Sequence, residues 1–150
     1  MGIQIEDLSV GEIFSSDPVI MSRERMRWYC DALETAASQS GKFIVADPTI
    51  HSDDEFALAN GLPGIVADGM LSTNYVSGLL YKHFGLNYLR SGALTTKFIR
   101  PVYEDEVLTA NLEITGIENK TVSMNIWVNL PDETKVTVGT AEVTIDEVEA

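Results

Sequence analysis

The first half of the chain places apolar residues at the spacing of an amphipathic helix. They follow Ser22, a residue type that favours helix N-caps, and recur every three or four positions: Met26, Tyr29, Cys30, Leu33, Ala36 and Ala37. Such a spacing brings the side chains to one helix face. The pattern predicts a helix that begins after Ser22 and ends at Gly41. Cys30 lies on that apolar face, which favours a packed thiol over a nucleophile.

An irregular segment and a short helix are expected next. Residues 45–51 contain Pro48, which excludes a regular helix in this segment. Asp53 and Asp54 are both residues that cap helices, and either can begin a short helix that runs through Ala59. The segment therefore predicts an irregular connection between the first helix and the short one.

A second long helix is predicted over residues 69–81, ending near Gly85. It has no charged residue over its first three turns. A helix without a polar face is buried on most sides. In a domain of this size, such burial requires another layer that wraps around the helix.

The second half of the chain supplies that layer. It holds four segments rich in Val, Ile and Thr, which alternate in places and predict strands over residues 94–100, 107–117, 121–130 and 135–145. Turn-forming residues lie at 118–120 and 131–133. Short turns between neighbouring strands produce an antiparallel meander. The expected fold is α+β, with a curled antiparallel sheet around one long central helix, and residues 1–150 are expected to form a single domain.

Composition narrows the choice of function. The chain has 150 residues, of which 45% are hydrophobic, so we expect one folded domain with its own core. The single cysteine excludes an intrachain disulfide. We find no signal peptide and no apolar stretch long enough to span a bilayer, and we therefore expect a soluble, cytoplasmic protein.

The charge distribution is uneven. The formal net charge is −13, and an acidic surface repels nucleic acids and anionic lipids, so neither is an expected partner. No Asp or Glu lies between Met70 and Tyr103, where the basic residues are Lys82, Arg90, Lys97 and Arg100. This stretch either gathers positive charge for an anionic ligand or reflects chance spacing around a buried element.

Several short motifs, taken in order, resemble the MaoC-like hydratase family. They are Asp7-Leu8-Ser9-Val10-Gly11, His51-Ser52-Asp53, Ile65-Val66-Ala67, Gly69-Met70-Leu71, Phe98-Ile99-Arg100-Pro101-Val102 and Glu106-Val107-Leu108-Thr109. The resemblance covers nearly the whole chain. It implies a hot-dog fold, usually as a dimer, and an acyl-CoA or acyl-carrier thioester as substrate. In many members it also implies (R)-specific hydration of a 2-enoyl thioester, or the reverse dehydration.

The same resemblance implies roles for particular residues. His51 matches the family base, and Asp47 is the nearest candidate for the carboxylate that assists it. Gly69 matches the position whose N–H binds the thioester oxygen, and Ser77 matches a hydroxyl that faces the site. The four basic residues between Met70 and Tyr103 become candidates for binding the CoA phosphates.

The sequence departs from the family pattern at two positions. Hydratases of this family typically have Asp five residues before the His, where this chain has Ala46, and Asp47 lies one residue closer. Asp68 stands where His often precedes Gly-Met. Asp68 is either an N-cap for the helix that begins at Gly69 or a replacement carboxylate in the site.

Three functions remain open at this stage. The first is a hydratase or dehydratase with His51 as base, and the second is a hot-dog thioesterase in which Asp68 assists attack of water on the carbonyl carbon. The third is a non-catalytic acyl-CoA-binding subunit that pairs with a related hot-dog chain. A metal site is not expected, because His51, Asp53 and His83 lack any standard ligand spacing. No cofactor is expected either.

Overall fold

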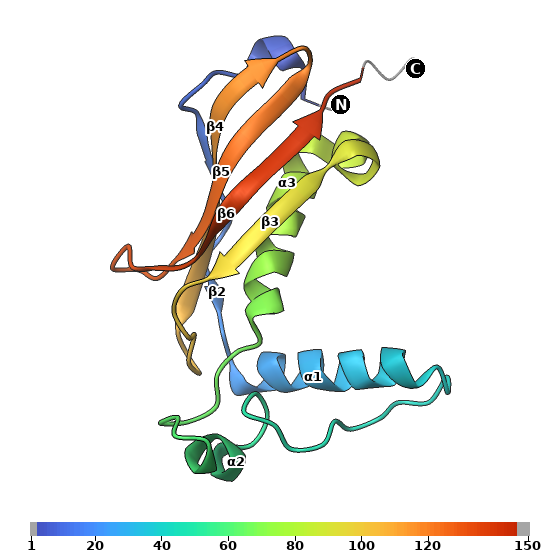
Figure 1. Cartoon of the computed structure of the whole chain (residues 1–150), viewed down its shortest axis with the longest axis vertical. Helices are drawn as coiled ribbons and strands as arrows, with labels where there is room; N and C mark the ends of the chain where they lie inside the picture. The colour runs from blue at the N-terminus through green and yellow to red at the C-terminus, as the bar shows by residue number, and fades with distance from the viewer. Residues whose placement is uncertain (1–2, 147–150) are drawn as a thin grey trace.

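A long helix, α3 (Gly69–Ser91), lies along one face of a curled antiparallel sheet, as the computed structural model of residues 3–146 shows (Figure 1). The strands are β1 (Ile13–Ser15), β2 (Val19–Ile20), β3 (Ala93–Phe98), β4 (Val107–Glu118), β5 (Thr121–Asn129) and β6 (Lys135–Thr144). Their order is β1-β4-β5-β6-β3, with β2 also paired to β4. This is the α+β, hot-dog arrangement that the sequence predicts.

The strand pairing refines the predicted meander. β4, β5 and β6 follow one another with short turns, as predicted. β3, however, pairs with β6 and not with β4, so after Phe98 the chain crosses from the edge strand β3 past β6 and β5 to β4. β1 and β2 were not predicted at all. They have three and two residues, which is too short for an alternating pattern to be recognised.

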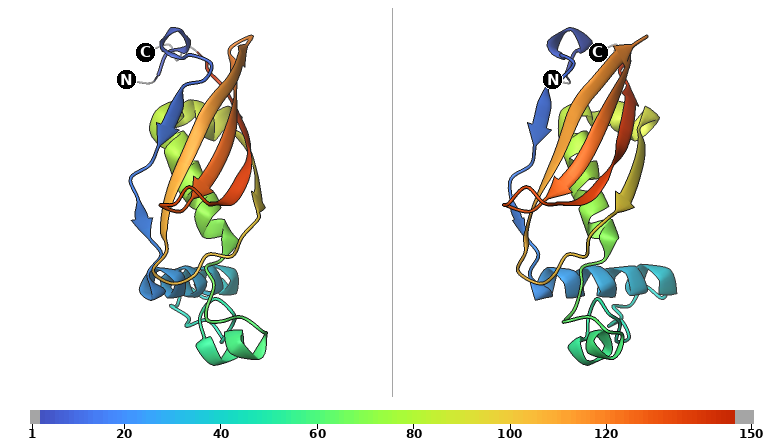
Figure 2. Two further views of the ribbon diagram at one scale, coloured as in Figure 1. Left: turned by 90° about the vertical axis from the view of Figure 1, so that its left-hand side faces the viewer. Right: turned by 60° about the vertical axis from the view of Figure 1, so that its left-hand side comes forward.

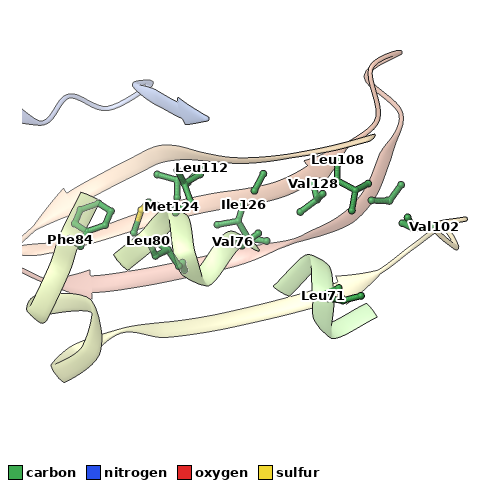
Figure 3. Packing of buried hydrophobic residues seen from close by; sticks show 14 of the residues in the cluster. Leu71, Val76, Leu80, Phe84, Val102, Leu108, Leu112, Met124, Ile126 and Val128 are labelled. Carbon is green, nitrogen blue, oxygen red and sulfur yellow. The ribbon is translucent and has the colours of Figure 1, made fainter. Parts of the chain in front are cut away.

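The core lies between α3 and the sheet. Figure 3 shows side chains of α3 directed at side chains of β4 and β5, and the labelled residues include Leu71, Val76, Leu80, Phe84, Leu112, Met124, Ile126 and Val128. The opposite side of α3 exposes Met70 and Tyr81. The prediction that this helix is buried on most sides is therefore wrong for a single chain. The predicted end near Gly85 is a kink (φ 53°, ψ −129°), after which the helix continues to Ser91.

Two helices form a lobe beyond the start of α3 (Figures 1 and 2). α1 (Arg23–Ser38) begins at the predicted cap, where Ser22 accepts a hydrogen bond from the Arg25 N–H. It ends earlier than predicted, because Gln39, two residues before Gly41, adopts the left-handed conformation that terminates it. α2 (Asp54–Ala59) is capped by Asp53.

Arg23 attaches this lobe to the sheet. Its guanidinium binds Asp54 at the start of α2 (2.8 Å) and Glu104 in the β3–β4 connection. These contacts raise the pKa of Arg23 well above its usual range. Within residues 3–146, none of the helices combines the length and apolar character that crossing a membrane requires.

Candidate active site

A tight turn positions His51 at the end of the irregular segment. The Thr49 N–H donates to the Ser52 hydroxyl (3.0 Å), and the His51 N–H donates to the Thr49 hydroxyl (3.1 Å). Asp53 then caps α2 by accepting from the Phe56 N–H (2.8 Å). Hydroxyl residues commonly stabilise turns in this way. Thr49 and Ser52 were not singled out in the sequence, although their spacing next to Pro48 is a recognisable turn signal.

The ring of His51 is held by the strand-like segment before α3. Its Nδ1 lies 2.8 Å from the Val66 carbonyl oxygen. Because a carbonyl can only accept, Nδ1 carries the proton and donates it. The Val66 N–H in turn donates to the Ile50 carbonyl (3.0 Å), and the Ala67 N–H donates to the Val102 carbonyl (2.8 Å). The neutral imidazole therefore presents the lone pair of Nε2 away from Val66.

Asp68 lies opposite that lone pair. Its Oδ1 accepts a hydrogen bond from the Met70 N–H (2.8 Å) and caps α3, while its Oδ2 lies 4.0 Å from His51 Nε2. Both side chains are 28% exposed. A distance of 4.0 Å is too long for a direct hydrogen bond, but one water oxygen can lie about 2.8 Å from both atoms at once. The two readings of Asp68, cap and site carboxylate, are therefore compatible, because they use different oxygens.

Two residues of α1 lie close to this carboxylate. Burial raises the pKa of the Tyr29 phenol, and the negative charge of Asp68 adds to the shift. Burial likewise raises the pKa of the Cys30 thiol, again with a contribution from Asp68. Both groups therefore remain protonated near neutral pH, and the Cys30 environment fits a packed thiol better than a nucleophile.

Gly69 borders a pocket next to the pair. A Cβ built at Gly69 would lie 2.5 Å from the Phe98 ring, so only glycine allows this contact between α3 and β3. Among residues 3–146, no group accepts a hydrogen bond from the Gly69 N–H. The pocket has a volume of about 300 Å³ and is lined by residues 66–69, residues 98–102, Ser72 and Thr137. It therefore contains both the helix start and the Asp68 carboxylate.

Two other predicted site residues lie elsewhere. Asp47 is exposed, and in the part of the chain that the structure describes its side chain makes no hydrogen bond or ion pair, either with His51 or with any other residue. The Ser77 hydroxyl lies 2.8 Å from the hydroxyl of Tyr88, a residue on the part of α3 that follows the kink at Gly85. The structure thus brings Asp68, and not Asp47, close to His51.

The four predicted CoA-binding residues do not form one patch. Arg100 lines the pocket and is paired with Glu106 (3.0 Å), which raises its pKa. Lys97 precedes Phe98 on β3; since Phe98 contacts α3, alternation directs Lys97 to the outer face of the sheet. Lys82 lies about 20 Å along the helix from Gly69, and Arg90 lies farther still.

Residues 3–146 include no group of three or more His, Cys, Asp or Glu side chains arranged to hold a metal ion. The chemistry available near Gly69 is therefore that of an imidazole, a carboxylate and a backbone N–H.

Comparison with known proteins finds a matching family model and solved structures of similar fold. Residues 47–137 match the family model described as MaoC like domain. The R-hydratase PhaJ1 from Pseudomonas aeruginosa, in its unliganded form, is 21% identical, with 97% of this chain and 91% of that chain covered and a TM-score of 0.70. An (R)-hydratase from A. caviae involved in PHA biosynthesis is 19% identical, with 94% of this chain and 99% of that chain covered and a TM-score of 0.71. A chain of the ChsH1-ChsH2 complex from Mycobacterium tuberculosis is 14% identical, with 92% of this chain and 98% of that chain covered and a TM-score of 0.67. No curated protein matches the sequence.

Proposed function

Since this chain belongs to the MaoC-like domain family, we propose that it hydrates a 2-enoyl thioester to the 3-hydroxyacyl thioester, or catalyses the reverse dehydration. The observation that carries the proposal is the 4.0 Å separation between His51 Nε2 and Asp68 Oδ2. Two structures of the same fold are (R)-hydratases, which supports this class of reaction.

The first step is attack of water on the β-carbon. Water between the two groups donates one hydrogen to Asp68 Oδ2, which orients it, and the other to His51 Nε2, which removes it as the oxygen attacks. The hydrogen bond from Nδ1 to the Val66 carbonyl keeps His51 in the required tautomer.

The second step is protonation of the α-carbon. Addition of hydroxide to the β-carbon moves the electron pair of the double bond toward the thioester carbonyl and forms an enolate. The Gly69 N–H, at the start of α3, is available to stabilise the negative oxygen. His51, now protonated at Nε2, returns the proton to the α-carbon, so that one water has been added and the imidazole is neutral again.

The test uses the purified chain with crotonyl-CoA, following enoyl absorbance and free thiol together. We expect loss of the enoyl absorbance without thiol release, and a decrease of about 10²–10⁴-fold in turnover for His51→Ala, the usual range for general-base catalysis. Hydration that is unaffected by His51→Ala would contradict the assignment of the base.

A thioesterase is the second candidate, and Asp68 is the reason to retain it. Its carboxylate lies at the helix start that would bind a thioester oxygen, where it could direct water to the carbonyl carbon. The same assay separates the two, because a thioesterase releases thiol from crotonyl-CoA.

We further propose that the chain acts as a dimer, either with a second copy or with a related hot-dog chain. Large apolar side chains on α1 and the segment after it are exposed, namely Trp28, Leu33, Phe43 and Val45, and such patches usually mark protein interfaces. One edge of β3 also lacks a partner strand among residues 3–146. The ChsH1-ChsH2 structure is a complex of two chains. If a related chain holds the active site, this chain alone will neither hydrate crotonyl-CoA nor release thiol. With its partner, whether a second copy or a related chain, light scattering should give a mass above that of a monomer.

Among the four basic residues we propose Lys97 for CoA binding, because it adjoins the pocket residue Phe98 from the outer face of the sheet and has no acidic partner among the described residues. Lys97→Glu should raise KM more than it lowers kcat, since phosphate contacts contribute equally to ground-state and transition-state binding. Arg90→Glu, far from Gly69, is the matched charge-reversal control. Equal effects of the two variants would indicate a general electrostatic influence.

A further inference from the structure

Two buried hydroxyl groups line the pocket next to the His51–Asp68 pair. Ser72 on α3 is 3% exposed, and Thr137 on β6 is 1% exposed. Among residues 3–146, neither hydroxyl has a hydrogen-bond partner, and no buried side-chain oxygen that is sealed from solvent lacks one. The small accessible surface of each residue therefore includes its hydroxyl oxygen, which opens into the pocket.

This arrangement differs from that of neighbouring hydroxyls. The Thr73 and Thr96 hydroxyls bond to each other between α3 and β3 (2.9 Å), and Ser77 bonds to Tyr88. A hydroxyl removed from bulk water without a partner is unfavourable, because it loses hydrogen bonds that it makes in water. Ser72 and Thr137, from opposite sides of one pocket, therefore present donors and acceptors suited to a ligand oxygen.

The charges around the pocket restrict that ligand further. Arg100 is the cation among the lining residues, and its guanidinium is already bound to both oxygens of Glu106. Asp68 adds a carboxylate to the lining. A ligand carboxylate would meet this charge without a free cation to balance it, so an uncharged oxygen fits better.

The volume of the pocket indicates how long an acyl chain it can hold. A cavity of about 150 Å³ holds a ligand the size of benzene, so the pocket of about 300 Å³ has room for a short acyl group, and a longer chain would extend out of it. The rest of the lining, including Val66, Phe98 and Val102, is apolar and suits the carbon chain.

We propose that this pocket binds the acyl group of the substrate, and that Ser72 and Thr137 select a short acyl chain with an uncharged oxygen, a hydroxyl or a ketone, near its end. The proposal rests on the proposed function, because it takes the thioester to lie at Gly69. Ser72 and Thr137 are then specificity-determining residues for the same reaction.

The experiment compares two saturated thioesters of equal size, hexanoyl-CoA and 5-hydroxypentanoyl-CoA, by titration calorimetry. Neither has a double bond, so their binding does not depend on hydration. We expect the hydroxylated thioester to bind at least about tenfold more tightly, since a site built around a hydroxyl discriminates strongly against its methyl analogue. In the double variant Ser72→Ala/Thr137→Val, which keeps the shape of the pocket, the preference should disappear.

Thr140→Val is the matched control, because Thr140 lies on the same strand as Thr137 but its exposed side chain is on the outer face. Its preference should equal that of the wild type, and melting curves establish that each variant folds. Equal or tighter binding of hexanoyl-CoA by the wild type, or a preference that persists in the double variant, would overturn the proposal and indicate that the hydroxyls bind water only.

The crotonyl-CoA assay distinguishes the two levels of inference. Hydration of crotonyl-CoA without discrimination between the saturated pair would refute the specificity proposal alone. Discrimination without hydration or thiol release would refute the proposed function and support an acyl-binding pocket. If crotonyl-CoA is neither hydrated nor cleaved and neither saturated thioester binds more tightly than CoA itself, both proposals are refuted.

Discussion

Asparagine at position 68 should separate the two roles of the aspartate. Asp68 caps α3 through Oδ1, which accepts from the Met70 N–H, and faces His51 Nε2 through Oδ2. An asparagine side chain retains an oxygen for the cap but replaces the second oxygen by an amide nitrogen, which donates. Asp68→Asn therefore removes the acceptor that orients the attacking water and leaves the helix capped.

The two roles have different expected magnitudes. Loss of a helix cap, as in Asp68→Ala, typically costs about 1 kcal/mol of stability, which lowers the melting temperature of a chain of this size by about 2–4 °C. Asp68→Asn should change it much less. For catalysis, both variants should lower turnover on crotonyl-CoA by about 10²-fold or more, at the lower end of the effect of removing a general acid–base group.

Asp47→Asn is the matched control, because it makes the same chemical change four residues before His51 at an exposed position without a contact among residues 3–146. Its turnover and melting temperature should equal those of the wild type. If Asp47→Asn lowers turnover while Asp68→Asn does not, then the carboxylate comes from the irregular segment and the geometry around Asp68 is only that of a cap.

Three further predictions follow from single contacts. Gly69→Ala should destabilise the fold by about 1–3 kcal/mol in chemical unfolding, because the new methyl group overlaps the Phe98 ring, and adding Phe98→Leu should recover part of the loss; an unchanged midpoint would contradict this packing. Cys30 should react with iodoacetamide at pH 8 more slowly than free cysteine, since burial and then the Asp68 charge raise its pKa, and Asp68→Asn should accelerate the reaction. Burial and a nearby lysine lower the pKa of His83, so the unfolded chain binds more protons than the folded one below about pH 6.5. Stability should therefore fall as the pH decreases from 7 to 5, and His83→Phe should reduce that slope in melting curves.

The parts of the fold that the sequence predicts are those with long local patterns. β4, β5 and β6 each span nine residues or more and are rich in Val, Ile and Thr, and their strand boundaries agree with the prediction to within one residue. β1 and β2 gave no such signal because they have three and two residues. Their pairing with β4 depends on residues about 90–100 positions away in the chain, which no local pattern indicates.

Hydrophobic periodicity also does not predict which helix faces are buried in the single chain. The helix α1 was predicted correctly, but of its predicted apolar face only Met26 is buried, and Leu33, Ala36 and Ala37 are exposed in the single chain. A hydrophobic stripe shows that a face prefers to be covered, and it does not identify the covering surface. The same is true of α3, where Met70 and Tyr81 interrupt the expected burial. In both cases the proposed second chain would cover these side chains.

At the site, the motifs identify candidate residues such as His51 but do not predict which carboxylate lies next to it. Counting positions along the chain made Asp47 the natural companion of His51, because they are four residues apart. The tight turn that begins at Thr49 instead directs the ring toward Val66, and Val66 immediately precedes the segment that ends in Asp68. On the proposed mechanism, the two departures from the family pattern, Ala46 and Asp68, are therefore one change. On that mechanism the site carboxylate comes from the helix start instead of the irregular segment, and the hydrogen bond from His51 Nδ1 to the Val66 carbonyl, two residues before Asp68, helps to fix its distance from Nε2.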